Sequence, residues 1–423
     1  MTYLKLRHLL GAGLAILILP TLAVAQDMSG ASPATSQAPA QQVSQQVLLQ
    51  RAVLQAWAEA SGHVRAGRPR AAIPILERLV TLAPGEYRFR LELARAYYLV
   101  EDDEKAAFHF EQSLGADLPE ATRNAVFQHQ ARIRARKRWE AQFSFSIAPE
   151  ANPARRTDAE TISILNEEFT LNQQAEAATA LHVTGRLTYL PRISRDLNAR
   201  VSASLDARLF ENSGLNDIRA GGEIGLVVNA DGGRAAGFGL TASRRWISSA
   251  AYSQSFGVYG TYETRMNART RLRFRGDLER IRHDTLSNRD GTRRRAQLNL
   301  IHVLTPTFGL RGGAFLTQTK AVSAAESGVQ AGLSLGATYV FDGGLMTAVD
   351  LGHMRERRGG VSNLFQTTRS DRTTSITVGM LHREFEFTGY APRLDILLER
   401  RNSTIPLFNF RNARVSVGLT RSF

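Results

Sequence analysis

The chain has 423 residues, with 53 Lys and Arg against 39 Asp and Glu, a formal net charge of +14 and no cysteine. The lack of cysteine excludes disulfides, a thiolate metal site and a lipid anchor on the chain itself. Beyond Leu19 no stretch is apolar enough for a transmembrane helix, so any later membrane crossing has to be made by strands.

Residues 1–25 have the pattern of a secretory signal peptide. Lys5, Arg7 and His8 precede an apolar run over residues 9–19, and small residues follow at 23–25, where a signal peptidase would cut. The run is shorter than the roughly 20 residues that cross a bilayer as a helix. We therefore expect export, and we do not expect nucleic acid as a partner despite the positive charge.

A linker and a helical domain are predicted next. Residues 26–43 are rich in Ser, Ala, Pro and Gln, which favours a disordered linker. Residues 44–137 have helical periodicity, and we predict helices at 53–66, 71–82, 87–100, 104–114 and 119–136. Four residues recur 34 positions later: Ala60, Ala72, Leu76 and Glu77 return as Ala94, Ala106, Phe110 and Glu111. This is the period of tetratricopeptide repeats, which are pairs of antiparallel helices.

Residues 138–423 are predicted to form a transmembrane antiparallel β-barrel. Short segments of alternating polarity repeat at the length that crosses an outer membrane. We place about fourteen of them, beginning near residues 140, 179, 198, 219, 235, 253, 270, 294, 308, 328, 345, 373, 393 and 411. An even count suits a closed bacterial barrel with both termini in the periplasm. The insert at 149–178 is the best candidate for a large surface loop or a plug.

Side chains on the lumen side of two predicted strands are strongly basic. Arg271, Arg273 and Arg275 form a row on one strand, and Arg293 and Arg295 lie on the next. Residues two apart on a strand are roughly 7 Å apart, so these charges must be compensated. Two interpretations stay open. One is a structural ladder with lumenal carboxylates such as Glu223, Asp277, Glu279 and Glu399, and the other is a path that attracts an acidic or phosphate-bearing client.

Motifs for enzymatic or cofactor chemistry are weak. The sequence from Gly332 to Gly336 fits a nucleophile-elbow pattern around Ser334, but it lies in an alternating strand without the required turn. The nine histidines show no metal-ligand spacing, and no phosphate-binding loop is present. We therefore predict no catalytic, metal or cofactor residues. The basic run at 132–138 is either a solvated helix end or a contact to inner-leaflet phosphates.

The order of a short helical domain and a fourteen-stranded barrel resembles the surface lipoprotein assembly modifier (Slam) family of outer-membrane translocators. The similarity is most specific in the closing hairpin, which includes Ile405, Pro406, Leu407 and Phe408 and then Arg414, Gly418, Leu419 and Phe423 in the last strand. Trp139 and residues 149–153 resemble the family's entry segment only in degenerate form.

The resemblance implies a non-enzymatic translocator in the outer membrane of a Gram-negative bacterium. Its partners would be a client lipoprotein or secreted protein, the barrel assembly machinery and outer-membrane lipids. The helical domain would receive the client, and the barrel would pass it outward, through its lumen or through the seam between the first and last strands. Pro406 removes a backbone donor near that seam, and we expect the seam to be correspondingly weak. Two alternatives remain: a polysaccharide exporter with helical repeats, or a passive porin.

Overall fold

The structure is a computed structural model that describes residues 38–136, 138–165, 167–172, 174–341, 345–382, 385 and 390–421. The predicted signal peptide, residues 26–37 of the predicted linker, and Phe423 lie outside the described residues. The chain divides into two compact units, residues 1–51 and 52–423. The second unit contains most of the helical domain and the whole barrel.

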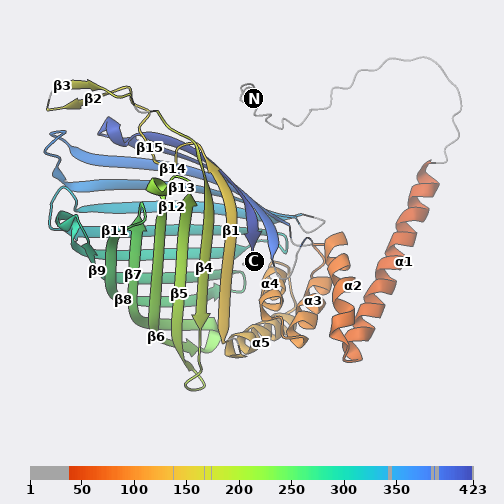
Figure 1. Ribbon diagram of the computed structural model, residues 1–423. Coiled ribbons are helices and arrows are strands. Elements are labelled where there is room, and N and C mark those ends of the chain that lie inside the picture. Colours follow the sequence, from red (N-terminus) through yellow and green to blue (C-terminus); the bar gives the residue numbers. More distant parts are fainter. Residues whose placement is uncertain are drawn as a thin grey trace, which may run out of the picture. The chain divides into compact units, whose positions relative to one another are not determined.

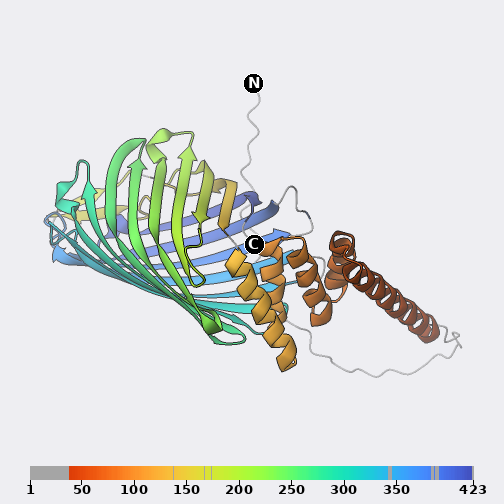
Figure 2. The ribbon, with the colours of Figure 1, turned by 90° about the horizontal axis from the view of Figure 1, so that it is seen from below.

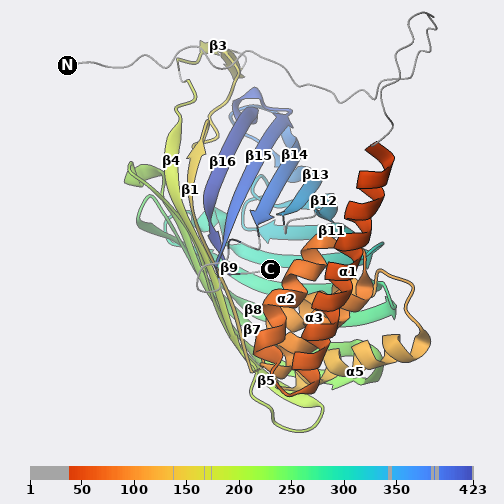
Figure 3. The same cartoon turned by 90° about the vertical axis from the view of Figure 1, so that its right-hand side faces the viewer.

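Five α-helices precede the strands in the described part of the chain (Figure 3). They are α1 (Ala38–Arg65), α2 (Pro69–Leu82), α3 (Tyr87–Leu99), α4 (Asp103–Ser113) and α5 (Glu120–Arg136). The first helix starts at Ala38, inside the stretch that we expected to be a linker. Pro39 is tolerated there because the first turn of a helix leaves its N–H groups unpaired. None of the described helices combines the length and hydrophobicity of a membrane span.

The positions of the 34-residue repeat form the core of the helical domain. Ala60, Ala72, Ala94 and Ala106 are fully buried, and they allow close packing of helix backbones. The larger side chains of the repeat, Leu76 and Phe110, are also buried, and each lies four residues after one of the small residues. The domain is therefore held together by small and large residues that alternate along the facing helices.

Fourteen strands of the described residues form a closed antiparallel barrel (Figures 1 and 2), and β1 lies between β4 and β16 (Figure 3). The barrel strands are β1 (Trp139–Glu150), β4 (Ala178–Tyr189), β5 (Leu197–Phe210), β6 (Asp217–Ala230), β7 (Arg234–Ile247), β8 (Ala250–Asn267), β9 (Thr270–His283), β10 (Gly291–Val303), β11 (Phe308–Ala321), β12 (Gly328–Val340), β13 (Leu345–Val361), β14 (Thr368–His382), β15 (Ala391–Ser403) and β16 (Phe410–Thr420). Two further strands, β2 (Thr161–Ile164) and β3 (Glu167–Thr170), form a separate hairpin in the insert.

Each barrel strand begins within five residues of its predicted start, which confirms the predicted fold class. The largest difference is in β14, which starts at Thr368 rather than near residue 373. The sequence from Thr368 to Arg372 is polar throughout, so it carries no alternation to detect. Strand pairing continues there through backbone hydrogen bonds, which do not require an apolar face.

The barrel has two distinct ends. We call the end at which β1 begins, directly after α5, the proximal rim, and the opposite end the distal rim. Short links such as 231–233, 268–269 and 304–307 join strands at the proximal rim. The insert at 151–177 and the links 284–290, 362–367 and 404–409 are at the distal rim. Exposed apolar side chains such as Phe274, Leu333 and Val417 lie on the outward face of their strands.

Candidate functional site: the seam and its supports

The seam between β1 and β16 is the only strand pairing in the barrel that joins its two sequence ends. β1 pairs with β4 along its full length, from Trp139 to Glu150. With β16 it pairs only from Ser144 to Ile147 and again at Glu150. Pro149 lies in this gap and cannot donate a backbone hydrogen bond. In the described residues, Trp139 to Gln142 have no partner on β16. The seam is therefore interrupted near the distal rim, and in the described residues its last backbone hydrogen bond toward the proximal rim is from the Arg421 N–H to the Phe143 carbonyl, at 2.9 Å.

Gly418 lies in the paired section of the seam and has no room for a side chain. A side chain at this position would place its Cβ within 2.6 Å of Ser146 Cα on the facing strand, closer than real Cβ atoms come. Gly418 pairs with Ser146, and its neighbour Leu419 pairs with Phe145. The resemblance singled out Gly418 and Leu419, and both belong to the short paired section of the seam.

The distal end of the seam is clamped by buried polar side chains. Glu150 is 2% exposed, accepts a hydrogen bond from Asn412 Nδ2 at 2.6 Å and forms an ion pair with Arg208 of β5. The Asn412 side-chain oxygen accepts a hydrogen bond from the Asn152 backbone N–H at 2.9 Å. Asn152 Nδ2 in turn donates to the Arg411 carbonyl at 3.1 Å. We call Glu150, Asn152, Arg208 and Asn412 the distal clamp. It compensates for the interrupted backbone pairing at Pro149.

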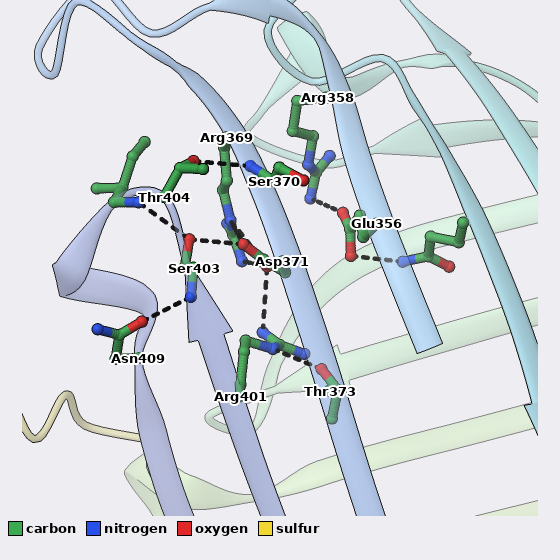
Figure 4. Close-up of polar contacts among 12 residues, drawn as sticks. Glu356, Arg358, Arg369, Ser370, Asp371, Thr373, Arg401, Ser403, Thr404 and Asn409 are labelled. Atoms are coloured by element: carbon green, nitrogen blue, oxygen red, sulfur yellow. Dashed lines mark hydrogen bonds and ion pairs between the residues drawn. The ribbon is translucent and has the colours of Figure 1, made fainter. Parts of the chain in front are cut away.

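The closing hairpin is anchored by a second buried carboxylate (Figure 4). Asp371 of β14 is 1% exposed and forms an ion pair with Arg369 at 2.6 Å. It also accepts a hydrogen bond from Ser403 Oγ at 2.7 Å. Arg401 points toward the same carboxylate, with its Nη1 at 3.9 Å, and donates to Thr373 Oγ1 at 3.2 Å. Ser403 is the last residue of β15, so this network fixes the start of the hairpin loop.

The hairpin residues singled out by sequence form a short helical turn, η4 (Pro406–Phe408). Ile405 is buried, and the Phe408 ring lies 3.5 Å from the Arg369 guanidinium. Pro406 lies before β16 begins and therefore outside the seam. Our expectation that Pro406 weakens the seam is wrong, because the proline that interrupts the ladder is Pro149 on β1. Leu407 completes the turn.

The insert at 151–177 lies over the closing hairpin. Thr157 Oγ1 donates a hydrogen bond to the Pro406 carbonyl at 2.6 Å, and the Leu165 backbone N–H donates to the Leu364 carbonyl at 3.2 Å. Arg155 forms an ion pair with Glu399 at 3.3 Å. These contacts attach the insert to the loops of the distal rim, so the insert supports the same end of the seam as the distal clamp.

The lumen ladder predicted from the sequence is largely paired with carboxylates. Arg275 lies 2.9 Å from Glu223 and 2.7 Å from Asp277. Arg293 forms an ion pair with Glu279 at 2.6 Å. These partners are three of the carboxylates that the structural interpretation named. The fourth, Glu399, pairs with Arg155 of the insert.

Two further ladder residues have partners that the sequence did not indicate. Arg273 pairs with Glu263 of β8 at 2.6 Å, and Arg271 pairs with Glu111 of helix α4 at 2.7 Å. Arg295 is the exception, since its recorded hydrogen bond, to Thr317 Oγ1 at 3.4 Å, is to a neutral group. The ladder thus carries most of its charge in ion pairs.

Glu111 joins the helical domain to the proximal rim. Its carboxylate contacts Arg271 and also Arg265, at 3.2 Å, and it accepts a hydrogen bond from Gln130 of α5 at 3.0 Å. The Arg265 guanidinium lies 5.0 Å from the Phe127 ring. Burial alone would raise the pKa of Glu111, but the two arginines and the hydrogen bonds outweigh it and lower that pKa.

Two more contacts accompany this joint. Asp117 forms an ion pair with Arg269, in the link between β8 and β9, at 2.6 Å. Gly115 lies against the backbone of the link between β10 and β11, and a Cβ there would come within 2.8 Å of the Pro306 nitrogen. The end of α4 therefore docks on two proximal links of the barrel.

Other residues named from the sequence lie in regular strands and helices. Ser334 lies in the middle of β12 and lacks the strand-to-helix turn of a nucleophile elbow. Arg136 forms an ion pair with Asp103, which fixes α5 against α4. Arg414 is on the lumen face of β16 at the register of Glu150. Among the described residues, no group of three or more His, Asp or Glu side chains is arranged to hold a metal ion.

Sequence reasoning missed Asp371, Arg208 and the joint at Glu111. Glu150 and Asn152 were noted only as part of a degenerate segment. The sequence did contain an indication of these contacts. A carboxylate near a strand end, at a position that points to the lumen, is buried when the barrel closes and must then have a partner. Which partner each would find depends on strands far away in the sequence.

Comparisons with known proteins place the chain among characterised families. The sequence profile of the family described as "Surface lipoprotein assembly modifier" matches residues 139–423. The surface lipoprotein assembly modifier of Moraxella catarrhalis is 22% identical over 381 residues, covering 88% of this chain and 74% of that protein. Surface lipoprotein assembly modifier 1 of Neisseria meningitidis serogroup B is 22% identical over 366 residues, covering 84% and 73%.

Solved structures give weaker similarities. A FadL homologue from Pseudomonas aeruginosa has a TM-score of 0.39 at 10% identity, covering 76% of this chain and 94% of that one. The outer membrane channel DcaP of Acinetobacter baumannii has a TM-score of 0.38 at 9% identity, covering 67% and 97%. TM-scores this low do not establish a shared fold, and the family assignment rests on the sequence matches.

Proposed function

The chain belongs to the surface lipoprotein assembly modifier family, and on that premise we propose that it delivers a client protein across the outer membrane to the cell surface. It is an outer-membrane β-barrel protein of a Gram-negative bacterium, with its helical domain on the periplasmic side. The proximal rim accordingly faces the periplasm and the distal rim faces the outside. The client is a lipoprotein or a related secreted protein, and the barrel assembly machinery inserts the barrel itself.

The observation that carries this proposal is the asymmetry of the seam. At the distal rim, Glu150 and Asn412 hold β1 and β16 together through side chains. At the proximal rim, β1 extends from Trp139 to Gln142 without a β16 partner among the described residues. Strands separate most easily where few backbone hydrogen bonds join them. The seam thus opens from the periplasmic side while the distal clamp acts as the hinge.

The helical domain supplies the receiving surface. Helical repeats bind proteins through the faces that their stacked helices present. Helix α4 is attached to the barrel through Glu111, Arg265 and Arg271. This joint keeps a bound client next to the proximal rim, so the chain captures the client and releases it at the place where the seam opens.

A disulfide across the seam tests the route. The chain has no cysteine of its own, so Ser144→Cys with Thr420→Cys creates a single pair at opposed positions of β1 and β16, at the proximal end of their paired section. We expect oxidation to abolish surface display of a co-expressed client and reduction to restore it. The matched control is Ala391→Cys with Thr420→Cys, which joins β15 to β16 at an opposed pair of the closing hairpin. This control should leave display unchanged.

Unchanged display with the β1–β16 disulfide fully formed would exclude the seam route. Deletion of residues 44–137 separates the translocator from a passive porin, because a porin keeps its conductance without the helical domain. The family membership does not favour the polysaccharide exporter. Export of a polymer rather than a protein by this chain would contradict the proposed function.

A further inference from the structure

The outer wall of the barrel carries a row of cations near the distal rim. Basic side chains face outward near the distal ends of six of the seven strands from β9 to β15. Those nearest to the apolar wall on each of these strands are Arg280, Arg294, Lys320, Arg355, Arg372 and Arg400, and β9 and β13 each carry a second outward arginine two residues nearer to the rim, Arg282 and Arg357. The six nearest to the wall are all exposed. Each is an even number of residues away from exposed apolar residues of its own strand, as Arg280 is from Leu278 and Arg400 from Leu398. They therefore point to the same, outward face of the barrel. We call them the outer basic belt.

The belt has no carboxylate partners in the part of the chain that the structure describes. Outward positions of β9 to β15 hold no Asp or Glu there. Arg400 has a recorded hydrogen bond, from its Nε to Asn402 Oδ1 at 3.2 Å, but that group is neutral. The lumen arginines differ, since most of them pair with carboxylates on neighbouring strands. The belt is therefore a strip of uncompensated positive charge on the outside of the barrel.

The strand register places like charges directly opposite each other in this strip. Arg355 of β13 faces Arg372 of β14, and Arg400 of β15 faces Arg411 of β16. Like charges at opposed positions destabilise a sheet. Arg411 has Asp158 at 3.3 Å, whereas the described residues offer no acidic partner to Arg355 or Arg372. An anion from outside the chain would relieve this repulsion.

The belt is at the edge of the apolar wall. Arg280 follows the exposed Leu278 by two residues, and Arg400 follows Leu398 by two, so these two cations are roughly 7 Å beyond the last apolar side chain. Lys320, Arg355 and Arg372 are four residues from the exposed Leu316, Leu351 and Ile376. A cation costs only about 0–1 kcal/mol so near a membrane interface. A hollow of about 410 Å³ on the outer wall is lined by Arg294, Lys320 and the apolar Val329. This combination fits a headgroup phosphate above an acyl chain.

The proximal rim is different. Its outward surface carries aromatic pairs, Trp139 with Tyr189 at 4.4 Å and Tyr339 with Phe341 at 4.6 Å between ring centroids. Aromatic rings suit a headgroup region of either charge. The cations are concentrated at the distal rim, which indicates that the lipids of the leaflet around it carry phosphates at a defined depth. The phosphorylated glycolipid of the outer leaflet fits this description.

We propose that the outer basic belt binds the phosphates of the outer-leaflet glycolipid, with the opposed pair Arg355 and Arg372 as its strongest site. Two guanidinium groups that face each other can hold one phosphate between them through paired N–H···O bonds. The lipid then supplies the negative charge that the described outward positions of β9 to β15 lack. This site does not depend on the proposed translocation activity.

Binding of lipid A to the purified full-length protein in nonionic detergent tests the proposal. We expect native mass spectrometry to show bis-phosphorylated lipid A retained at least ten-fold more tightly than the dephosphorylated form, with binding that weakens as salt rises. Arg355→Gln with Arg372→Gln should reduce that affinity about ten-fold. The matched control, Arg186→Gln with Arg219→Gln, removes the same charge from lumen-lining residues and should leave binding unchanged.

The difference between unboiled and boiled samples in gel mobility verifies that each variant contains a folded barrel. If the Arg355 and Arg372 variant does not fold, Arg294→Gln with Lys320→Gln tests the same belt at the hollow. Equal binding of phosphorylated and dephosphorylated lipid A, or full binding by the folded belt variant, would overturn the proposal. Equally tight binding of phosphatidylglycerol would overturn the assignment to the glycolipid.

Discussion

The distal clamp predicts that Glu150 contributes far more to barrel stability than an ordinary ion-paired carboxylate. Its side chain is 1% exposed, and the side chain of its partner Arg208 is 16% exposed. Glu150→Gln leaves the Arg208 cation without its counter-charge in a buried place. Removing one partner of a buried pair costs about 3–5 kcal/mol, because the remaining charge is uncompensated. The hydrogen bond from Asn412 can be retained by the Gln carbonyl, so we expect the lower part of that range.

A urea titration of the barrel folded in phospholipid vesicles measures this loss, with the folded fraction read from gel mobility. Glu399→Gln is the control, because Glu399 pairs with the more exposed Arg155 across 3.3 Å. Such a pair is worth about 0–1 kcal/mol. Glu150→Gln with Arg208→Gln should be less destabilised than the sum of the two single variants. If Glu150→Gln costs no more than Glu399→Gln, the clamp does not hold the seam.

Three further outcomes follow from the same structure. Gly418→Ala forces β1 away from β16 and should lower the urea midpoint of the barrel by the equivalent of about 1–3 kcal/mol, whereas Gly312→Ala, which has free space around it, should have little effect. Leu76→Ala, at a fully buried core position, should destabilise the helical domain by about 2–5 kcal/mol in thermal unfolding followed by circular dichroism. Because the folded-state pKa of Glu111 is lowered from 4.5, its contribution to the joint is complete above that value and is lost as pH falls through the lowered pKa. Protease protection of the helical domain should therefore decrease at acid pH, and Glu111→Gln should reduce protection at neutral pH and remove this pH dependence.

The predicted strands succeeded because the signal for a lipid-facing strand is local. An apolar residue at every second position, as in Leu394, Ile396 and Leu398, is required wherever the outer face meets lipid, whatever strand lies beside it. The same holds for the 34-residue repeat, whose small and large positions proved to be the buried core. The prediction was least accurate at β14, where the strand extends past the apolar band and no such requirement exists.

The site was less predictable than the fold. Gly418 and Leu419 were chosen by resemblance, and both lie in the paired part of the seam. Pro406 was given the wrong role, because a proline before the last strand and a proline within the first strand look alike until the register is known. Pro149 has its effect only through the strand that lies opposite it.

The sequence by itself determined the alternation of faces along each strand, the number of strands and the basic character of the lumen wall of the barrel, since each of these follows from neighbours within about ten residues. Only the tertiary structure decided which charges meet. Closure of the barrel brings Glu150 beside Asn412, 262 positions away along the chain, and places Arg355 opposite Arg372, with no acidic partner for either among the described residues. Register between strands is set by the whole closed ring, and a shift of one residue would exchange every inward and outward side chain.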